Sequence, residues 1–208
     1  MIDLYMDTTA NGYRAAIVLE ESGLPYRPHR VDHHAGETLT PDFIALSPLS
    51  KVPVIVDHDG PGGAPLTLAQ SGAIALYVAQ KSGRLLPADE AARFAALQWF
   101  FHVMTDHVGT NTALVFLPRL AEKPVAAIAD FEARLTTYFG RVDRRLADVE
   151  YLAGQVSIAD LALYPIIVRR PHLLAPPGLD NLKRWRDRMA TRPGVIRGLK
   201  ALPPEPGS

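Results

Sequence analysis

The sequence contains no cysteine. This absence excludes a disulfide framework, a thiolate metal site and a protein-borne thiol nucleophile. The chain also lacks a net charge, because 22 basic residues balance 22 acidic ones, so its overall charge does not favour a nucleic acid or an anionic membrane as a partner. No run approaches the roughly 18 apolar residues of a membrane span. We therefore predict a soluble globular protein without nucleic-acid or membrane partners.

Histidines are present, but their spacing does not favour a metal site. His33 and His34 are adjacent, and His102 and His107 lie roughly 140° apart around a helix, so each pair diverges. Residues 1–5 do not begin a basic segment followed by an apolar one, which is the pattern of a secretory signal. We therefore expect no metal cofactor and a cytoplasmic location.

The pattern of apolar residues changes near residue 83 of the 208-residue chain. Before it, short apolar segments alternate with helical periodicity in the order βαβαββα, which is that of a thioredoxin-like fold. After it, only helical periodicity remains. We predict a thioredoxin-like α/β domain over residues 1–82 and an all-helical bundle over residues 90–202. We expect the tail from residue 202 to be loosely held.

The predicted elements follow from periodicity and turn signals. The strands are expected at 2–6, 26–31, 52–56 and 66–68. The helices are expected at 13–21, 41–46 and 71–80 in the first domain, with Thr40 opening the second of them. In the second domain they are expected at 91–116, 125–149, 158–168, 182–190 and 195–201.

A proline opens the third predicted strand, in the pair Val52-Pro53. Proline removes one donor from a sheet and marks an edge or a special turn. A cis bond before Pro53 would present the N–H and C=O of Val52 to a peptide lying alongside as an added strand. The alternative is an ordinary trans proline at a strand end.

The pair Gln70-Ser71 stands at the start of an apolar helix, where the first backbone N–H groups lack partners within the helix. Such an end binds anions, and the Gln70 amide adds a donor and an acceptor. The alternative is that Ser71 only caps its own helix. By contrast, the segment from Val156 to Leu161 has a structural explanation, because Ser157 and Asp160 are spaced as a capping box.

Taken together, these segments resemble the glutathione transferase family. The matching motifs occur in order over nearly the whole chain. They are Leu4-Tyr5, Asn11–Arg14, Ser47–Pro53, Gln70–Ile74 and Tyr151–Asp160. The opening residues and the Asn-Gly pair are most similar to the bacterial nu-class enzymes, some of which are glutathione-dependent disulfide reductases. The family's usual acidic residue before the helix serine is Gln70 here, and Ala10 stands where other classes have a serine near the sulfur.

The resemblance implies a role for several residues. Thr9 and Asn11 would stabilise the glutathione thiolate, although Asn11 alternatively caps its helix. Val52 and Pro53 would hold the cysteinyl backbone, and Gln70 and Ser71 the γ-glutamyl end. Thr38 and Lys51 would contact the glycyl side, although Lys51 is equally a solvated loop charge. A second substrate would meet the sulfur near Met104, Thr105 and Val108, although such apolar residues also occur in cores.

The function implied is that of a glutathione transferase. It would stabilise the thiolate of its co-substrate, glutathione, for attack on an electrophile, a peroxide or a disulfide, and it would form a homodimer. The alternative is a protein of this fold that has lost turnover and serves as a binding or assembly module, because a fold does not by itself establish a function.

Overall fold

The computed structural model describes residues 1–203 and divides the chain into two compact units. Of the described residues, the first unit contains 1–85 together with 191–203, and the second contains 86–190. The predicted fold class is confirmed, with a sheet and helices in the first unit and helices alone in the second. Most of the expected loose tail, residues 204–208, lies outside the described residues.

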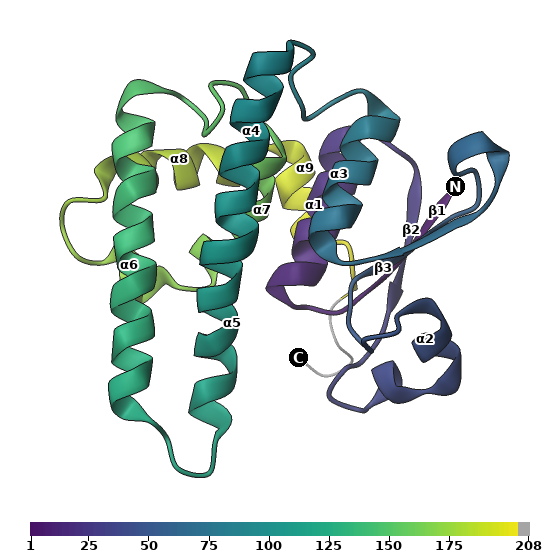
Figure 1. Ribbon diagram of the computed structural model, residues 1–208, viewed down its shortest axis with the longest axis horizontal. Helices are drawn as coiled ribbons and strands as arrows, with labels where there is room; N and C mark the ends of the chain where they lie inside the picture. The colour runs from purple at the N-terminus through teal and green to yellow at the C-terminus, as the bar shows by residue number, and fades with distance from the viewer. Residues whose placement is uncertain (204–208) are drawn as a thin grey trace. The chain divides into compact units, whose positions relative to one another are not determined.

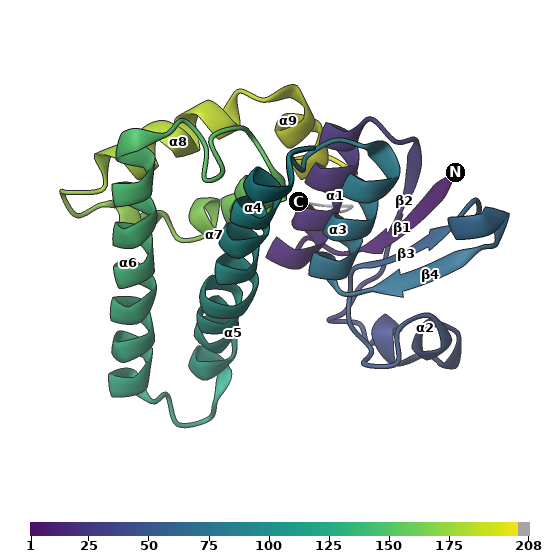
Figure 2. The ribbon, with the colours of Figure 1, turned by 45° about the horizontal axis from the view of Figure 1, so that its top comes forward.

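The first unit is built on a four-stranded sheet in the order β2-β1-β3-β4 (Figure 1 and Figure 2). The central strand β1 runs parallel to β2 and antiparallel to β3, which forms an antiparallel hairpin with β4. Apolar side chains of β1 are fully buried, as expected for a strand covered on both faces. The strands are β1 (Ile2–Met6), β2 (Tyr26–Arg30), β3 (Val54–Asp57) and β4 (Leu66–Ala69).

Helices α1 and α3 cover one face of this sheet, and α2 lies on the other side (Figure 2). Thr40 caps α2 as expected, because its hydroxyl accepts a hydrogen bond from the N–H of Phe43. The predicted order βαβαββα is confirmed. The helices are α1 (Ala10–Ser22), α2 (Pro41–Leu46) and α3 (Ser71–Ser82).

The last helix, α9 (Pro193–Leu199), packs against α1 in the first unit. A Cβ added at Gly198 would lie 2.6 Å from the Cα of Ile17, so the two backbones are in direct contact. Arg192 and Glu21 form an ion pair beside this contact. The division therefore differs from the predicted helical domain of residues 90–202, whose C-terminal segment belongs with the thioredoxin-like residues because of this packing.

The second unit contains α4 (Glu90–His102), α5 (Val108–Phe116), α6 (Val125–Asp148), α7 (Ile158–Val168) and α8 (Asp180–Ala190). A π-helical turn, Val103–His107, joins α4 to α5. The single helix predicted over 91–116 is therefore interrupted, which periodicity cannot reveal because every residue of the turn keeps a helical conformation. The apolar α7 is buried along nearly its whole length and forms the centre of this unit. None of the helices in residues 1–203 has the length and apolar character needed to cross a membrane.

Candidate functional site

The N-terminal end of α1 carries two of the predicted site residues. Thr9 is the N-cap, with extended backbone angles, and its hydroxyl oxygen accepts a hydrogen bond of 3.0 Å from the N–H of Gly12. Thr9 rather than Asn11 therefore caps the helix. Because the cap uses only the oxygen as acceptor, the Thr9 O–H proton is available to another partner.

Gly12 explains the Asn-Gly pair of the sequence motif. A Cβ at this position would lie 2.1 Å from the carbonyl oxygen of Asp7, a separation that no side chain tolerates. The first turn of α1 is therefore pressed against the loop that follows β1. This close approach holds Thr9 and Asn11 in a defined position relative to the sheet.

Arg14 connects the starts of α1 and α3. Its side chain has no exposed surface, and its Nη1 donates hydrogen bonds to Oδ1 of Asn11 and, over 2.9 Å, to the hydroxyl oxygen of Ser71. Both acceptors thus keep their own donor groups, the Asn11 amide N–H and the Ser71 O–H, for a ligand. Burial lowers the pKa of Arg14 to about 10, which leaves the guanidinium charged at neutral pH.

Arg14 belongs to the motif Asn11–Arg14, but it was not among the predicted site residues. The available signal was a guanidinium on the inward face of an otherwise apolar helix segment, beside Ala15 and Val18. A fully buried arginine requires fixed partners, because the cost of desolvating its charge is high. Those partners come from two predicted site motifs, so Arg14 is the residue that joins them.

At the start of α3, Gln70 is the N-cap residue and Ser71 is the first helical residue. The alternative in which Ser71 only caps its own helix is wrong, because Gln70 is the N-cap and the Ser71 hydroxyl oxygen accepts a hydrogen bond from Arg14. Gln70 has a φ of 74°, a conformation that is uncommon for residues other than glycine and that clusters at ligand sites. Its side chain is exposed and makes no capping hydrogen bond.

The Val52–Pro53 peptide bond is cis, which was one of the two possibilities left by the sequence. Ser47 organises the preceding loop, because its buried hydroxyl donates to the carbonyl of Lys51 and accepts from the N–H of the same residue. Neither the N–H nor the C=O of Val52 has a hydrogen-bond partner among residues 1–203. This short main-chain segment is thus available to a peptide ligand at the end of β3.

The remaining predicted site residues have more varied environments. Thr38 is buried in a 3-10 turn, Glu37–Leu39, whereas the Lys51 side chain is exposed. Met104 and Val108 are half-buried at the π-helical turn of the second unit. Thr105 is exposed, and its hydroxyl donates to the carbonyl of Phe101 over 2.8 Å. Within residues 1–203, no group of three or more histidine, aspartate or glutamate side chains is arranged to hold a metal ion.

This geometry places the positive ends of two helices, α1 and α3, around one buried guanidinium, with an open main-chain segment at Val52 in the same unit. Helix N-termini attract carboxylates and thiolates, and an unpaired strand segment binds peptide backbone. The arrangement is suited to a small anionic peptide.

Comparisons with known proteins identify two family domains. Residues 10–81 match the family described as "Glutathione S-transferase, N-terminal domain", and residues 94–193 match "Glutathione S-transferase, C-terminal domain". Among curated proteins, the chain is 33% identical to disulfide-bond oxidoreductase YfcG of Escherichia coli, covering 96% of this chain and 94% of the relative. It is also 26% identical to the transcriptional regulator URE2 of Saccharomyces cerevisiae, covering 91% of this chain and 65% of the relative.

Among solved structures, the chain is similar to a glutathione transferase from Pseudomonas putida, which has one glutathione disulfide bound per subunit. The sequences are 34% identical, the TM-score is 0.90, and the match covers 98% of this chain and 92% of the other.

Proposed function

Because the chain belongs to the glutathione S-transferase family, we propose that it binds glutathione and uses the glutathione thiolate to reduce disulfides or attack other electrophiles. One observation carries this proposal. Asn11, from the motif Asn11–Arg14, and Ser71, from the motif Gln70–Ile74, are bonded to the same buried guanidinium, so the two helix ends form one prepared site.

Each part of glutathione has a matching group in the first unit. The γ-glutamyl carboxylate would bind at the start of α3, to Ser71 and Gln70. The cysteinyl backbone would pair with the N–H and C=O of Val52, beside Pro53. The sulfur would then lie at the start of α1, where the Thr9 hydroxyl, the Asn11 amide and the helix dipole favour a negative charge.

The chain has no cysteine, so the attacking sulfur has to come from glutathione. In the proposed reaction, the thiolate attacks one sulfur of a disulfide and breaks the S–S bond, which releases the other sulfur as a thiolate. A second glutathione then attacks the mixed disulfide and releases glutathione disulfide. The disulfide bound to the Pseudomonas putida structure and the name of the YfcG relative support disulfide chemistry.

Several further predictions belong to this proposal. Thr38 and Lys51 are proposed to face the glycyl end, and Met104, Thr105 and Val108 to line the pocket of the second substrate. The chain is proposed to act in the cytoplasm as a homodimer. Sedimentation and cell fractionation test these last two points directly.

The test combines calorimetry with turnover. Wild-type protein should bind glutathione and reduce hydroxyethyl disulfide. A halogenated arene and a hydroperoxide are assayed as two further substrates. Asn11→Ala should lower kcat/KM by about 10²-fold, which is the usual effect of removing one hydrogen-bond donor to an anion that forms during a reaction. The affinity for glutathione should be largely kept. Thr137→Ala removes an exposed hydroxyl on α6 and should behave as wild type.

A second function is favoured by the similarity to URE2, whose printed name is that of a transcriptional regulator. In that case the chain would be a binding or assembly module of this fold without turnover. Binding of glutathione with no activity on any of the three substrates would favour the module. Absence of any heat on titration with glutathione would contradict both functions.

A further inference from the structure

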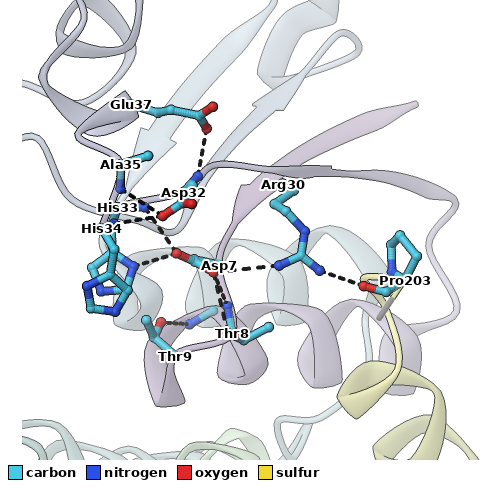
Figure 3. Close-up of polar contacts among 11 residues, drawn as sticks. Asp7, Thr8, Thr9, Arg30, Asp32, His33, His34, Ala35, Glu37 and Pro203 are labelled. Carbon is cyan, nitrogen blue, oxygen red and sulfur yellow. Dashed lines mark hydrogen bonds and ion pairs between the residues drawn. The ribbon is translucent and has the colours of Figure 1, made fainter. Parts of the chain in front are cut away.

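A single buried carboxylate connects the loop before α1 to the loop after β2. Asp7 follows β1, and its Oδ1 accepts a hydrogen bond of 2.6 Å from the N–H of Thr8 (Figure 3). Its Oδ2 accepts from the main-chain N–H of His33 over 3.1 Å and from the ring Nδ1 of the same histidine. Thr9, the predicted thiolate ligand, is therefore two residues from a carboxylate that also holds an imidazole.

Asp7 determines the orientation of the His33 ring. Because the carboxylate accepts at Nδ1, that nitrogen carries the hydrogen, and Nε2 is left with its lone pair. No hydrogen bond to Nε2 is found within residues 1–203, and 32% of the side-chain surface is exposed. An imidazole with one nitrogen held by a carboxylate and the other open is the arrangement of a proton acceptor with its orienting group.

The charged neighbours of this pair are held in place. Arg30 approaches Asp7, with 4.0 Å between Nη1 and Oδ1. The ring of His34 lies against that of His33, with centroids 3.9 Å apart, but the side chain of His34 forms no hydrogen bond or ion pair with Asp7. Asp32 accepts from the N–H of His34, and Glu37 accepts from the N–H of Asp32, so both acids are engaged in the loop.

The Asp7 side chain is a carboxylate at neutral pH. Burial raises the pKa of Asp7, but hydrogen bonds from the His33 side chain and from the His33 and Thr8 main chains outweigh it and hold the pKa below its usual range. A carboxylate in this state stabilises a positive charge on the imidazole next to it.

The proposed reaction needs an acceptor for the thiol proton of glutathione. Glutathione has to lose its thiol proton before it attacks, and neither a threonine hydroxyl nor an asparagine amide accepts a proton near neutral pH. Histidine is the side chain suited to that task in this pH range. His33 is the histidine tied to the Thr8–Thr9 loop.

We propose that His33, oriented by Asp7, is the general base for the glutathione thiol, an inference that rests on the proposed function. The thiol S–H bond breaks and an N–H bond forms at Nε2, which leaves a thiolate at Thr9 and Asn11 and an imidazolium paired with Asp7. After the thiolate has cleaved the disulfide, the imidazolium returns the proton to the departing thiolate. His33 is then neutral again, and Asp7 acts throughout as a positioning residue.

The test compares His33→Gln, Asp7→Asn and the matched control His34→Gln in the full chain. The rate with glutathione and hydroxyethyl disulfide is measured from pH 5.5 to 9.5. Over the same range, the thiolate of bound glutathione is followed by its ultraviolet absorbance. At pH 7, His33→Gln should lower kcat/KM by about 10²-fold, the lower end of the usual range of general-base effects. At pH 9.5 the deficit should disappear, because a free thiol ionises by itself above about pH 8.5.

A purely structural role would give a loss that does not change with pH, and that result would overturn the proposal. An unchanged pH profile in His33→Gln, or an equal change in His34→Gln, would overturn it as well. Asp7→Asn should shift the profile in the same direction as His33→Gln, with thermal unfolding of each variant as the check on folding. If wild-type protein binds no glutathione, the proposed function fails too. If wild-type protein binds glutathione and turns over, but His33→Gln has the pH profile of wild type, only this inference is overturned.

Discussion

Arg14 joins the two helix ends of the candidate site through one buried guanidinium. A buried charge is costly unless it is hydrogen-bonded, and Nη1 of Arg14 donates to both Asn11 and Ser71. The planar guanidinium reaches two acceptors on different helices at once. A residue that completes the core of the first unit thereby also sets the orientation of two predicted ligand contacts.

Arg14→Lys should weaken the site although it keeps the charge. A lysine ammonium on a longer flexible chain cannot reproduce the geometry of the guanidinium, so Ser71 or Asn11 loses its donor. We expect the dissociation constant for glutathione to rise about tenfold, which corresponds to the roughly 1–3 kcal/mol of a buried hydrogen bond left unmade. Calorimetry measures the affinity, and urea denaturation the free energy of unfolding.

Arg84→Lys is the control for that substitution. Arg84 is an exposed residue whose Nη1 donates to the carbonyl of Ser22, so lysine there should leave both affinity and stability nearly unchanged. Equal affinities for Arg14→Lys and wild type would contradict the role assigned to the guanidinium.

At the scale of an element, the start of α7 is the clearest local structure in the second unit. The capping box predicted from the sequence is confirmed, with Ser157 as N-cap and Asp160 returning a bond to the Ser157 N–H. The same carboxylate also accepts from the N–H of Leu152 and from Nε1 of Trp185 on α8. Asp160 therefore joins the helix start to the preceding loop and to a neighbouring helix.

Asp160→Ala should destabilise the protein much more than Ser157→Ala. Removal of the serine cap costs about 0.5–2 kcal/mol. Loss of the carboxylate leaves several buried donors unsatisfied, so we expect a loss of at least about 3 kcal/mol. Chemical denaturation measures both, and the exposed Asp130→Ala on α6 should stay within about 0.5 kcal/mol of wild type. Similar losses for Asp160→Ala and Ser157→Ala would refute the wider role of Asp160.

At the scale of the whole molecule, the two ends of the chain build the first unit together. Helix α9 lies against α1, and Arg192 and Arg197 form ion pairs with Glu21 and Glu20 on that helix. The unit that carries Thr9, Asn11, Val52 and Ser71 is therefore completed only by residues after 190.

Gly198→Ala should destabilise the first unit. The added Cβ would lie 2.6 Å from the Cα of Ile17, and a backbone atom cannot move aside as a flexible side chain does. We expect the free energy of unfolding to fall by about 1–3 kcal/mol, which is the usual cost of overpacking. Thermal unfolding measures this change. At Gly140 on α6, an added Cβ would meet no atom within 4 Å outside the backbone of its own helix, so Gly140→Ala should instead raise the free energy of unfolding by about 0.5–1 kcal/mol. A gain in both variants would argue against close packing of α9.

The sequence alone determined the order of strands and helices, the capping box at Ser157 and the cap at Thr40. These features depend on residues within a turn or two of one another, so their physical cause is present in the local sequence. Through the resemblance of its short motifs to those of the family, it also suggested Thr9, Asn11, Val52 and Ser71 as candidate ligands. Helix ends were predicted less accurately. For example, α1 begins at Ala10, three residues before its predicted start at Tyr13.

Only the tertiary structure decided which of those segments act together. Arg14 meets Ser71 across 57 positions, His33 meets Asp7 across 26, and α9 returns to α1 from the far end of the chain. Such contacts follow from how the sheet and helices pack, which places residues side by side without leaving a pattern in either local segment. The burial that makes Arg14 and Asp7 effective is likewise a property of the folded whole, because a charge is desolvated only when several elements close around it.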